Sequence, residues 1–332
     1  MSFYIGIDIG GTKIAGGIVT ERGEVLGTKS CPTPVKLGGP KILEDSIALA
    51  AQLLKDSGDK KIEGIGIGAG GQIDSERGLV YSATDVLPGW RGLHITDAFI
   101  QELGLKAAVD NDVNVLALGE ARFGAAAALK NSTVVFLALG TGVGGGLLCS
   151  GFLHHGANWS GGEFGHILLT MDPNARRDLG GAVGTLEAYC SGPGLVQTWQ
   201  ELTGNKDQSM TGEDVVADAQ GNPGGPGSIA ITKTGEYLGY GLVTLANALD
   251  PNLIIIGGGL ASLGDALLNP AREVLKKRAL PGPSKCPVVQ AKLGANAAIV
   301  GAASLVMPGS SDFEVALAKT KQSHQPSEIH SR

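Results

Sequence analysis

Two glycine-rich turns carry the residues best suited to chemistry, and each lies between two hydrophobic runs. The first spans residues 8–13 (Asp-Ile-Gly-Gly-Thr-Lys), and the second spans residues 140–146 (Gly-Thr-Gly-Val-Gly-Gly-Gly). Glycine lets backbone N–H groups come close to an oxyanion, so a turn of this composition can bind phosphate. Two such turns facing each other would hold one polyphosphate from both sides, which predicts a nucleotide bound in a cleft.

The first turn combines these glycines with an acid, a hydroxyl and a cation. Asp8 ends an apolar run, where a carboxylate is costly to bury unless it meets a cation, so we expect it to bind Mg²⁺ directly or through water. The alternative is that Asp8 is a solvent-exposed acid in a loop and binds no cation. Thr12 and Lys13 could offer a hydroxyl and a positive charge to phosphate oxygens, although Lys13 could equally point into solvent.

The second turn formally matches a dinucleotide-binding fingerprint, with glycines at 140, 142 and 145. That fingerprint requires a helix after the glycines. Here the chain continues as an apolar run broken by glycine, which is typical of a strand. A phosphate-binding turn between two strands is therefore preferred, and a simple hairpin is the alternative for this turn taken alone.

Residues 109–114 (Val-Asp-Asn-Asp-Val-Asn) place two carboxylates and two amides where a strand ends and a helix begins. Helix capping favours the same residue types but needs only one of them. One acid at such a strand end, directed into a cleft, could accept a hydroxyl proton, as phosphoryl transfer requires. A further pair, Glu163 and His166, is spaced to converge on a helical or tight glycine turn, where both could bind sugar hydroxyls or a metal.

The apolar periodicity predicts the elements that position these residues. We expect strands at residues 3–9, 14–20, 25–29, 62–67, 106–109, 133–139, 145–149, 253–256 and 288–292. We expect helices at residues 42–54, 111–124, 195–202, 235–249, 263–275 and 297–305. The first three strands form an antiparallel meander. The order of strands and helices occurs twice, which predicts two α/β lobes with a cleft between them.

Composition narrows the class of protein. A chain of 332 residues is long enough for two domains, and its net charge of −6 without a basic cluster argues against a nucleic-acid surface. No export signal, membrane span or basic amphipathic stretch is evident, so we expect a cytoplasmic protein that does not bind membranes. The four cysteines have neither disulfide nor zinc spacing, which suits a reducing compartment.

With these motifs in order, the chain resembles the ROK family (repressors, open reading frames, kinases) of the actin and hexokinase superfamily from residue 4 to residue 305. The resemblance lies in DIGGTK, VDNDVN followed by ALGEARFG, LGTGVGGG, GEFGH and the late IIIGGGL. It implies an α/β, two-lobed actin/hexokinase-like (ribonuclease H-like) duplicated fold with a central cleft. We expect an N-terminal lobe at 1–123 and a C-terminal lobe at 124–307 whose last helix packs back on the first. The polar residues 308–332 are expected to be disordered.

The resemblance also implies roles for individual residues. Asp112 would be the catalytic base, with Asn111 beside it holding a hexose. The other sugar contacts would come from Gly70, Gly71, Thr84, Glu163, His166 and Glu187. The nucleotide would be bound by Asp8, Gly10, Gly11, Thr12, Lys13, Thr141, Gly142, Gly257, Gly258 and Gly259, the last three lying against the adenosine.

The chain departs from the family at two places. Many ROK proteins carry a zinc motif of cysteines ending at the sugar-binding glutamate, but here Asp178, Gly180 and Thr185 occupy the thiolate positions, so we expect no structural zinc. The side chain of His166 would then bind only the sugar and no zinc ion. The second departure is Ser-Ala-Thr at residues 82–84, where bacterial glucokinases of the family commonly have Ser-Pro-Asn and some N-acetylmannosamine kinases have threonine.

These observations predict a hexose kinase that uses ATP and Mg²⁺ and phosphorylates the hydroxyl at carbon 6 of a sugar. Glucokinase is the first choice among such enzymes. N-acetylmannosamine kinase or another hexose kinase of the family is the alternative within enzymes. A non-catalytic sugar-binding or regulatory protein is the alternative from another class. Polyphosphate or ADP stays open as the phosphate donor, and the resemblance implies a homodimer.

Overall fold

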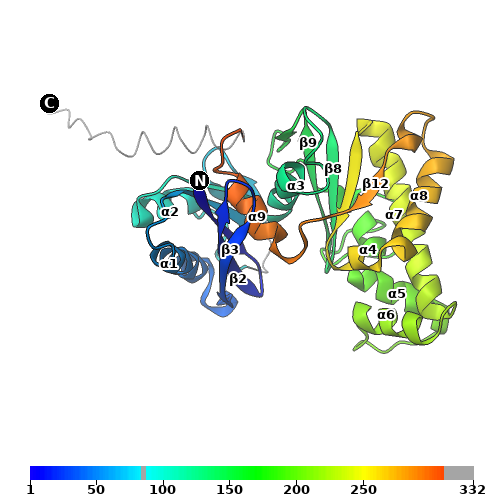
Figure 1. The fold of residues 1–332 in the computed structure, drawn as a ribbon. Coiled ribbons are helices and arrows are strands. Elements are labelled where there is room, and N and C mark those ends of the chain that lie inside the picture. Colours follow the sequence, from blue (N-terminus) through cyan, green and yellow to red (C-terminus); the bar gives the residue numbers. More distant parts are fainter. Residues whose placement is uncertain (84–86, 310–332) are drawn as a thin grey trace, which may run out of the picture. The chain divides into compact units, whose positions relative to one another are not determined.

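The computed structural model describes residues 1–83 and 87–309, which form a mixed α/β chain divided into two compact units (Figure 1). Of these described residues, unit 1 contains those within 1–127, 155–160 and 293–309, and unit 2 contains 128–154 and 161–292. Among the described helices, none combines the length and the apolar character that crossing a bilayer would require. The predicted disordered tail lies, from residue 310 onward, outside the described residues.

The sheet of unit 1 has the strand order β3-β2-β1-β4-β7. β1 (Phe3–Ile9), β2 (Lys13–Thr20) and β3 (Val25–Pro32) form the predicted antiparallel meander, while β4 (Ile62–Ala69) and β7 (Ala107–Asn111) lie parallel to β1. All five strands were predicted from the sequence, and their predicted existence is confirmed.

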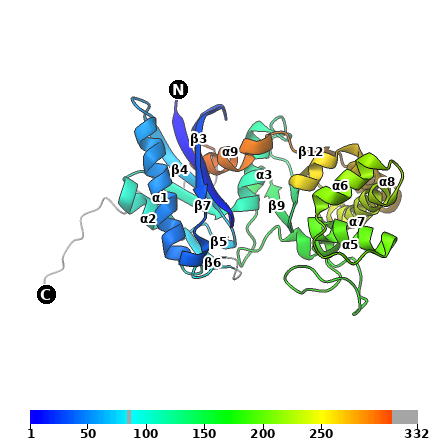
Figure 2. The same ribbon diagram turned by 90° about the horizontal axis from the view of Figure 1, so that it is seen from below.

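One face of this sheet is built from branched apolar side chains. The alternate residues Ile5, Ile7 and Ile9 of β1 are fully buried, and they pack in one cluster with side chains of α1 (Gly39–Asp56) and α2 (Ile95–Leu103). Figure 2 shows these two helices on one side of the sheet, with α3 and α9 on the other. Period-two alternation therefore sorts the isoleucines onto the helix-covered core face.

The opposite face carries glycines where a helix packs against it. A Cβ at Gly6 or Gly66 would collide with the backbone of Ile299 or Ala302 in α9 (Ala297–Ser304). α9 also packs closely against α3 (Asp112–Phe123). The last described helix therefore packs on the unit 1 sheet at backbone distance, which only glycine permits.

The sheet of unit 2 repeats this topology with the order β10-β9-β8-β11-β12. β8 (Val134–Leu139), β9 (Val143–Cys149) and β10 (Phe152–Leu153) are antiparallel, and β11 (Leu253–Gly257) and β12 (Val288–Gln290) run parallel to β8. Each glycine turn connects the first and second strands of its sheet. The predicted duplication is therefore present, and it gives both turns the same topological position.

The helices of unit 2 follow in the order α4 (Leu186–Cys190), α5 (Gly192–Thr203), α6 (Gly212–Gly221), α7 (Pro226–Leu249) and α8 (Asp265–Arg278). α7 and α8 pack closely on each other, and their buried leucines form one core with the apolar side chains of β8 and β11. The predicted helices at 195–202 and 235–249 are confirmed within longer elements, and the helix predicted at 263–275 is confirmed as α8, which spans Asp265–Arg278.

The elements that the periodicity did not predict are short or weakly amphipathic. They are the hairpin of β5 (Gln72–Asp74) and β6 (Leu79–Ser82), the two-residue strand β10, the helices α2, α4 and α6, and the 3₁₀ turns Val35–Leu37, Phe164–His166, Gly259–Leu263, Pro283–Lys285 and Gly294–Asn296. In α6 only Val215 is buried, and the helix starts at a capping box between Thr211 and Asp214. One apolar anchor leaves no periodic signal in the sequence.

Candidate functional site

The first glycine turn is a tight connection fixed by a neighbouring threonine. The N–H of Gly10 donates to the carbonyl of Lys13 at 3.1 Å, and Thr33 donates from Oγ1 to Gly10 at 2.6 Å and from its N–H to Thr12 at 3.0 Å. Gly11, Thr12 and Lys13 are exposed at the tip. Hydrogen bonds from Thr33 therefore fix the conformation of the turn, and its exposed tip can contact an anion.

Asp8 lies on the glycine-lined face of the unit 1 sheet. It is in register with Gly68 of β4, which is itself in register with Asp110 of β7, so the two acids share one face. Burial raises the pKa of the Asp8 carboxyl, and the charge of Lys13 acts in the opposite direction. A partly buried carboxylate of this kind is stabilised by a bound cation, and its oxygen chemistry fits Mg²⁺.

Asn111 and Asp112 form the start of α3. The Oδ1 atom of Asn111 caps the helix by accepting from the N–H groups of Val113 at 2.8 Å and Asn114 at 3.2 Å, and its Nδ2 donates to the carbonyl of Gly71 at 2.9 Å. Asp112 is the first residue of α3, and its Oδ1 accepts from Val113 at 2.9 Å. Asn111 alone satisfies the cap, so the carboxylate of Asp112 is additional to what the helix requires.

The loop at Gly70 and Gly71 is anchored on both of its carbonyls. The indole Nε1 of the fully buried Trp90 donates to Gly70 at 3.1 Å, and Asn111 donates to Gly71. Gly71 has a φ of +102°, and a Cβ there would lie 2.6 Å from the carbonyl oxygen of Ser82. The structure thus brings three predicted sugar-binding residues together. Thr84, predicted to join them, lies outside the described residues.

Sequence reasoning missed one residue of this region. The Nε2 atom of His155 lies 2.6 Å from Oδ2 of Asp110, although the two are 45 positions apart. Residues 155–160, which include His155, belong to unit 1 together with Asp110. The only hint in the sequence was the surplus of polar side chains at 110–114.

The second glycine turn is linked to two helices of unit 2. Its Gly140 accepts from the N–H of Gly192, the first residue of α5, at 2.7 Å. Glu187 of α4 accepts with Oε2 from the N–H of Val143 at 2.9 Å. A Cβ at Gly142 would lie 2.6 Å from that same oxygen. A side chain at position 142 would therefore displace this carboxylate oxygen of Glu187.

The predicted pair Glu163 and His166 flanks a 3₁₀ turn packed against β9. Gly162 and Gly165 of this segment lie so close to the backbone of β9 that a Cβ at either would collide with it, Gly165 at Val143 and Gly162 at Gly145. The backbone of this turn therefore lies directly against β9, which positions the residues on either side of it.

The carboxyl of Glu163 is electrostatically perturbed. Limited hydration in its surroundings is the largest cause and raises its pKa; His166 acts to lower it, and the carboxylate of Glu187 raises it further. These three side chains therefore sense one another, which groups three predicted sugar contacts of unit 2. Two acids and an imidazole in one place can accept and donate hydrogen bonds to several hydroxyls.

The loop that precedes α4 lacks the thiolate donors that zinc prefers. Asp178 and Thr185 lie at two expected thiolate positions, and Gly180 has no side chain. Within residues 1–83 and 87–309, no group of three or more His, Cys, Asp or Glu residues is arranged to hold a metal. Cys190 is buried in the core of unit 2, where burial raises the pKa of its thiol. These residues do not fit a zinc site.

Hydrogen bonds within the loop before α4 stabilise its conformation. The buried carboxylate of Asp178 accepts from the hydroxyl of Thr185 at 2.8 Å and from the N–H of Ala182 at 2.9 Å, and Oδ2 lies 3.9 Å from Nδ1 of His166. The hydroxyl of Thr185 also accepts from Ala188 as the N-cap of α4, the helix that carries Glu187. Asp178 therefore connects the loop to the helix behind a predicted sugar contact.

The side chain of Arg176 connects the loop before α4 to α5 through hydrogen bonds. Its guanidinium forms two hydrogen bonds to Glu201 at 3.0 and 2.6 Å and one to Thr198 at 2.9 Å, and it lies over the rings of Tyr189 and Tyr237 at 4.8 and 5.6 Å. A bidentate pair stacked on aromatic rings is a rigid arrangement. The sequence carried no signal for it.

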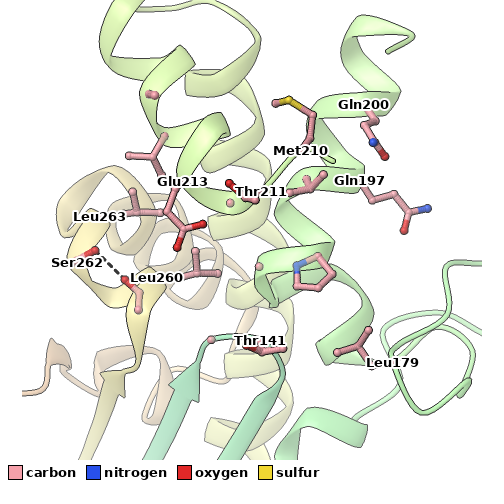
Figure 3. A pocket seen from close by; sticks show the side chains of 18 of the residues that line it. Thr141, Leu179, Gln197, Gln200, Met210, Thr211, Glu213, Leu260, Ser262 and Leu263 are labelled. Carbon is pink, nitrogen blue, oxygen red and sulfur yellow. Dashed lines mark hydrogen bonds between the residues drawn. The ribbon is translucent and has the colours of Figure 1, made fainter. Parts of the chain in front are cut away.

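A cavity of about 1030 Å³ opens beside the second glycine turn. In Figure 3, Thr141 lies in the turn between β8 and β9, Leu260 and Leu263 lie on one side of the cavity, and Met210 and Thr211 lie on another. The N-terminal residues of α5 and α6 also border the cavity. Helix N-termini and backbone N–H groups favour a bound anion there.

The three glycines predicted to contact the adenosine differ in their surroundings. Gly259 lines the cavity. A Cβ at Gly257 would lie 2.7 Å from the ring of Phe136, and Gly258, with a φ of +82°, packs against the backbone of Leu139. Gly257 and Gly258 therefore allow β11 to approach β8 below the cavity.

Comparison with known proteins places the chain in a family. The family model of the ROK family matches residues 4–308. A glucokinase from Halalkalibacterium halodurans is 33% identical over 334 residues, covering 94% of this chain and 97% of its own. An N-acetyl-D-glucosamine kinase from Salmonella paratyphi B is 32% identical, with coverages of 91% and 98%.

A solved structure agrees with these matches. The crystal structure of a ROK family glucokinase from Streptomyces griseus, in complex with glucose and AMPPNP, is 32% identical and has a TM-score of 0.74, covering 91% of this chain and 98% of its own. The predicted actin/hexokinase-like fold is confirmed by this likeness and by the two sheets of repeated topology. The chain belongs to the ROK family.

Proposed function

We propose that this sugar kinase transfers the γ-phosphate of ATP to the 6-hydroxyl of glucose. The proposal is supported by the similarity to a glucokinase along nearly the whole chain and to a glucokinase structure that contains glucose and AMPPNP. The observation in this chain that carries it is the 1030 Å³ cavity beside the Thr141 turn. A large cavity next to a glycine turn suits a nucleoside with its phosphates on the turn.

ATP would lie with its adenosine in this cavity, near Gly259, and its phosphates on Thr141 and Gly142. Gln197 and Glu213 lie among the polar groups of the cavity wall, whereas Leu260 and Leu263 offer apolar surface for a base. The first glycine turn would supply Gly10, Gly11, Thr12 and Lys13 to the phosphates. Lys13 is exposed and brings the positive charge that such a contact needs.

Asp112 would act as the base. The hydroxyl proton passes to its carboxylate as the sugar oxygen attacks the γ-phosphorus, the bond to the bridging oxygen of ADP breaks, and ADP leaves as the sugar phosphate forms. Asn111 and the Gly70–Gly71 loop are proposed sugar contacts. Glu163, His166, Glu187 and Thr84 are the other proposed contacts to sugar hydroxyls.

Asp8 would hold Mg²⁺, directly or through water. The raised pKa of this carboxyl and its place behind the first turn fit an oxygen ligand for a hard cation. Bound Mg²⁺ neutralises charge on the phosphate oxygens. The loop before α4, in contrast, has no set of residues that could bind zinc. We therefore propose that the enzyme needs Mg²⁺ but not zinc.

The experiment that tests this function is an ADP-release assay with purified protein, ATP and Mg²⁺ on a panel of sugars. We expect the highest kcat/KM with glucose; N-acetylglucosamine, N-acetylmannosamine, mannose, fructose and allose are the competitors. The similarity to an N-acetyl-D-glucosamine kinase makes that sugar the second candidate. Turnover with an N-acetyl sugar but not with glucose would reassign the substrate, and ATP would be compared with ADP and polyphosphate as donors.

We further propose a homodimer in the cytoplasm, on the basis of the family resemblance. Light scattering coupled to size-exclusion chromatography measures the assembly directly. A mass equal to one chain of 33.7 kDa at assay concentration would contradict the dimer.

A further inference from the structure

Asp110 holds a fully buried carboxylate immediately before the proposed sugar-binding and catalytic residues. Its exposed fraction is 0%, and both of its oxygens have partners. Oδ1 accepts from the N–H of Asn111 at 2.6 Å and from Nδ2 of Asn114 at 2.9 Å, while Oδ2 lies 2.6 Å from Nε2 of His155. The carboxylate is thus bound to the first turn of α3 on one side and to a distant imidazole on the other.

His155 reaches Asp110 from a segment that leaves the second sheet. Residues 155–160 belong to unit 1, although the chain on both sides of them belongs to unit 2. The imidazole is 16% exposed; its ring centre lies 5.6 Å from that of Trp159, and its Nε2 lies 3.5 Å from Oγ of Ser75. The ring is therefore enclosed by several contacts and presents one nitrogen to Asp110.

A buried carboxylate needs partners that compensate for its lost hydration. Capping of α3 does not explain the buried carboxylate of Asp110, because the side chain of Asn111 already caps that helix. Asp110 instead fixes the backbone at Asn111 and the side chain at Asn114, the two positions that bracket Asp112. The pair with His155 in turn fixes the carboxylate of Asp110. A displacement of about 1 Å at a reacting group can lower a rate about 100-fold.

We propose that Asp110 and His155 form a positioning pair that holds Asn111 and Asp112 in the geometry required for phosphoryl transfer. This inference rests on the proposed role of Asp112 as the base. His155 acts through Asp110 and is a positioning residue. Its loss releases the buried carboxylate and, through it, the first turn of α3.

The test compares His155→Ala and His155→Gln with the matched control His154→Ala. The side chain of His154, one position earlier, belongs to an exposed residue. We expect His155→Ala to lower kcat about 10- to 100-fold while KM for ATP changes less than about 2-fold, since the cavity lies in unit 2. His155→Gln keeps an N–H that can donate to Asp110, so it should retain more activity. Added imidazole should restore part of kcat to His155→Ala, and His154→Ala should match the parent.

Three outcomes would overturn the inference. A parental kcat in His155→Ala, while Asp112→Asn is inactive, would refute the pair and leave the proposed base intact. A lower kcat in His155→Ala that neither glutamine nor imidazole improves, together with a lower Tm, would assign the pair a structural role only. A parental kcat in Asp112→Asn would refute the base and the pair together.

Discussion

Glu187 and Val143 are joined by a hydrogen bond of 2.9 Å from the backbone N–H of the valine to Oε2 of the glutamate. This bond links a proposed sugar contact to the end of the second phosphate turn. One carboxylate oxygen is thereby committed to the turn, which leaves the other for a ligand. We therefore expect the proposed sugar contact at Glu187 and the proposed phosphate contacts of the Thr141 turn to depend on each other.

Replacing Gly142 with alanine should break this coupling. The new Cβ would lie 2.6 Å from Oε2 of Glu187, so the carboxylate must move and lose its bond to Val143. We expect kcat/KM to fall about 10- to 100-fold for both ATP and sugar, measured by ADP release. Gly27→Ala is the control, because a Cβ at Gly27 meets nothing within 4 Å. A change confined to one substrate would contradict the coupling.

Asp112→Asn tests the proposed base. The amide keeps the size of the side chain but cannot take up the hydroxyl proton, so kcat should fall about 10²- to 10⁴-fold while sugar binding, followed by calorimetry, is retained. Asp59→Asn, at an exposed residue after α1, is the control and should match the parent. A nearly unchanged kcat would remove Asp112 from the mechanism.

Glu163→Gln should change the dependence of stability on pH. Folding raises the pKa of Glu163 above its ordinary value of 4.5, so the folded chain binds this proton more tightly than the unfolded chain. The free energy of unfolding therefore falls as pH rises from 4.5 through the raised pKa, and this contribution is absent in the glutamine variant. The variant should be more stable than the parent at pH 7, with the difference vanishing below pH 4.5.

Urea unfolding between pH 4 and pH 8 measures this effect. Glu102→Gln, at an exposed residue of α2, serves as the control. We also expect Glu163→Gln to raise KM for the sugar, because an NH₂ donor replaces one of the two acceptor oxygens of the carboxylate. A stability difference that stays constant across the pH range would show that the titration of Glu163 is not involved.

Thr185→Val tests how the loop before α4 is ordered. Valine keeps the shape of threonine but removes the donor to the buried Asp178 and the cap acceptor for Ala188. Leaving these groups without their partner should cost about 2 kcal/mol in the free energy of unfolding. Thr232→Val, at an exposed position of α7, is the comparison. An equal effect of both substitutions would mean that the Asp178 contact does not order the loop.

The local sequence predicted most of the regular structure. Alternating isoleucines in β1, helical spacing in α1 and α8, and the two glycine turns each carry their signal within a few neighbouring residues. The chain also determined the family, through five motifs in order. The absence of thiolates before Glu187 was visible in the residue types alone.

Only the tertiary structure decided which distant groups meet. His155 and Asp110 are 45 positions apart, Glu187 and Val143 are 44 apart, and Trp90 reaches Gly70 across 20. No periodicity encodes such pairs, because each depends on strand register, loop path and the close approach that glycine allows. The sequence therefore determined the parts of the site, and packing determined which oxygen and nitrogen atoms hold them in place.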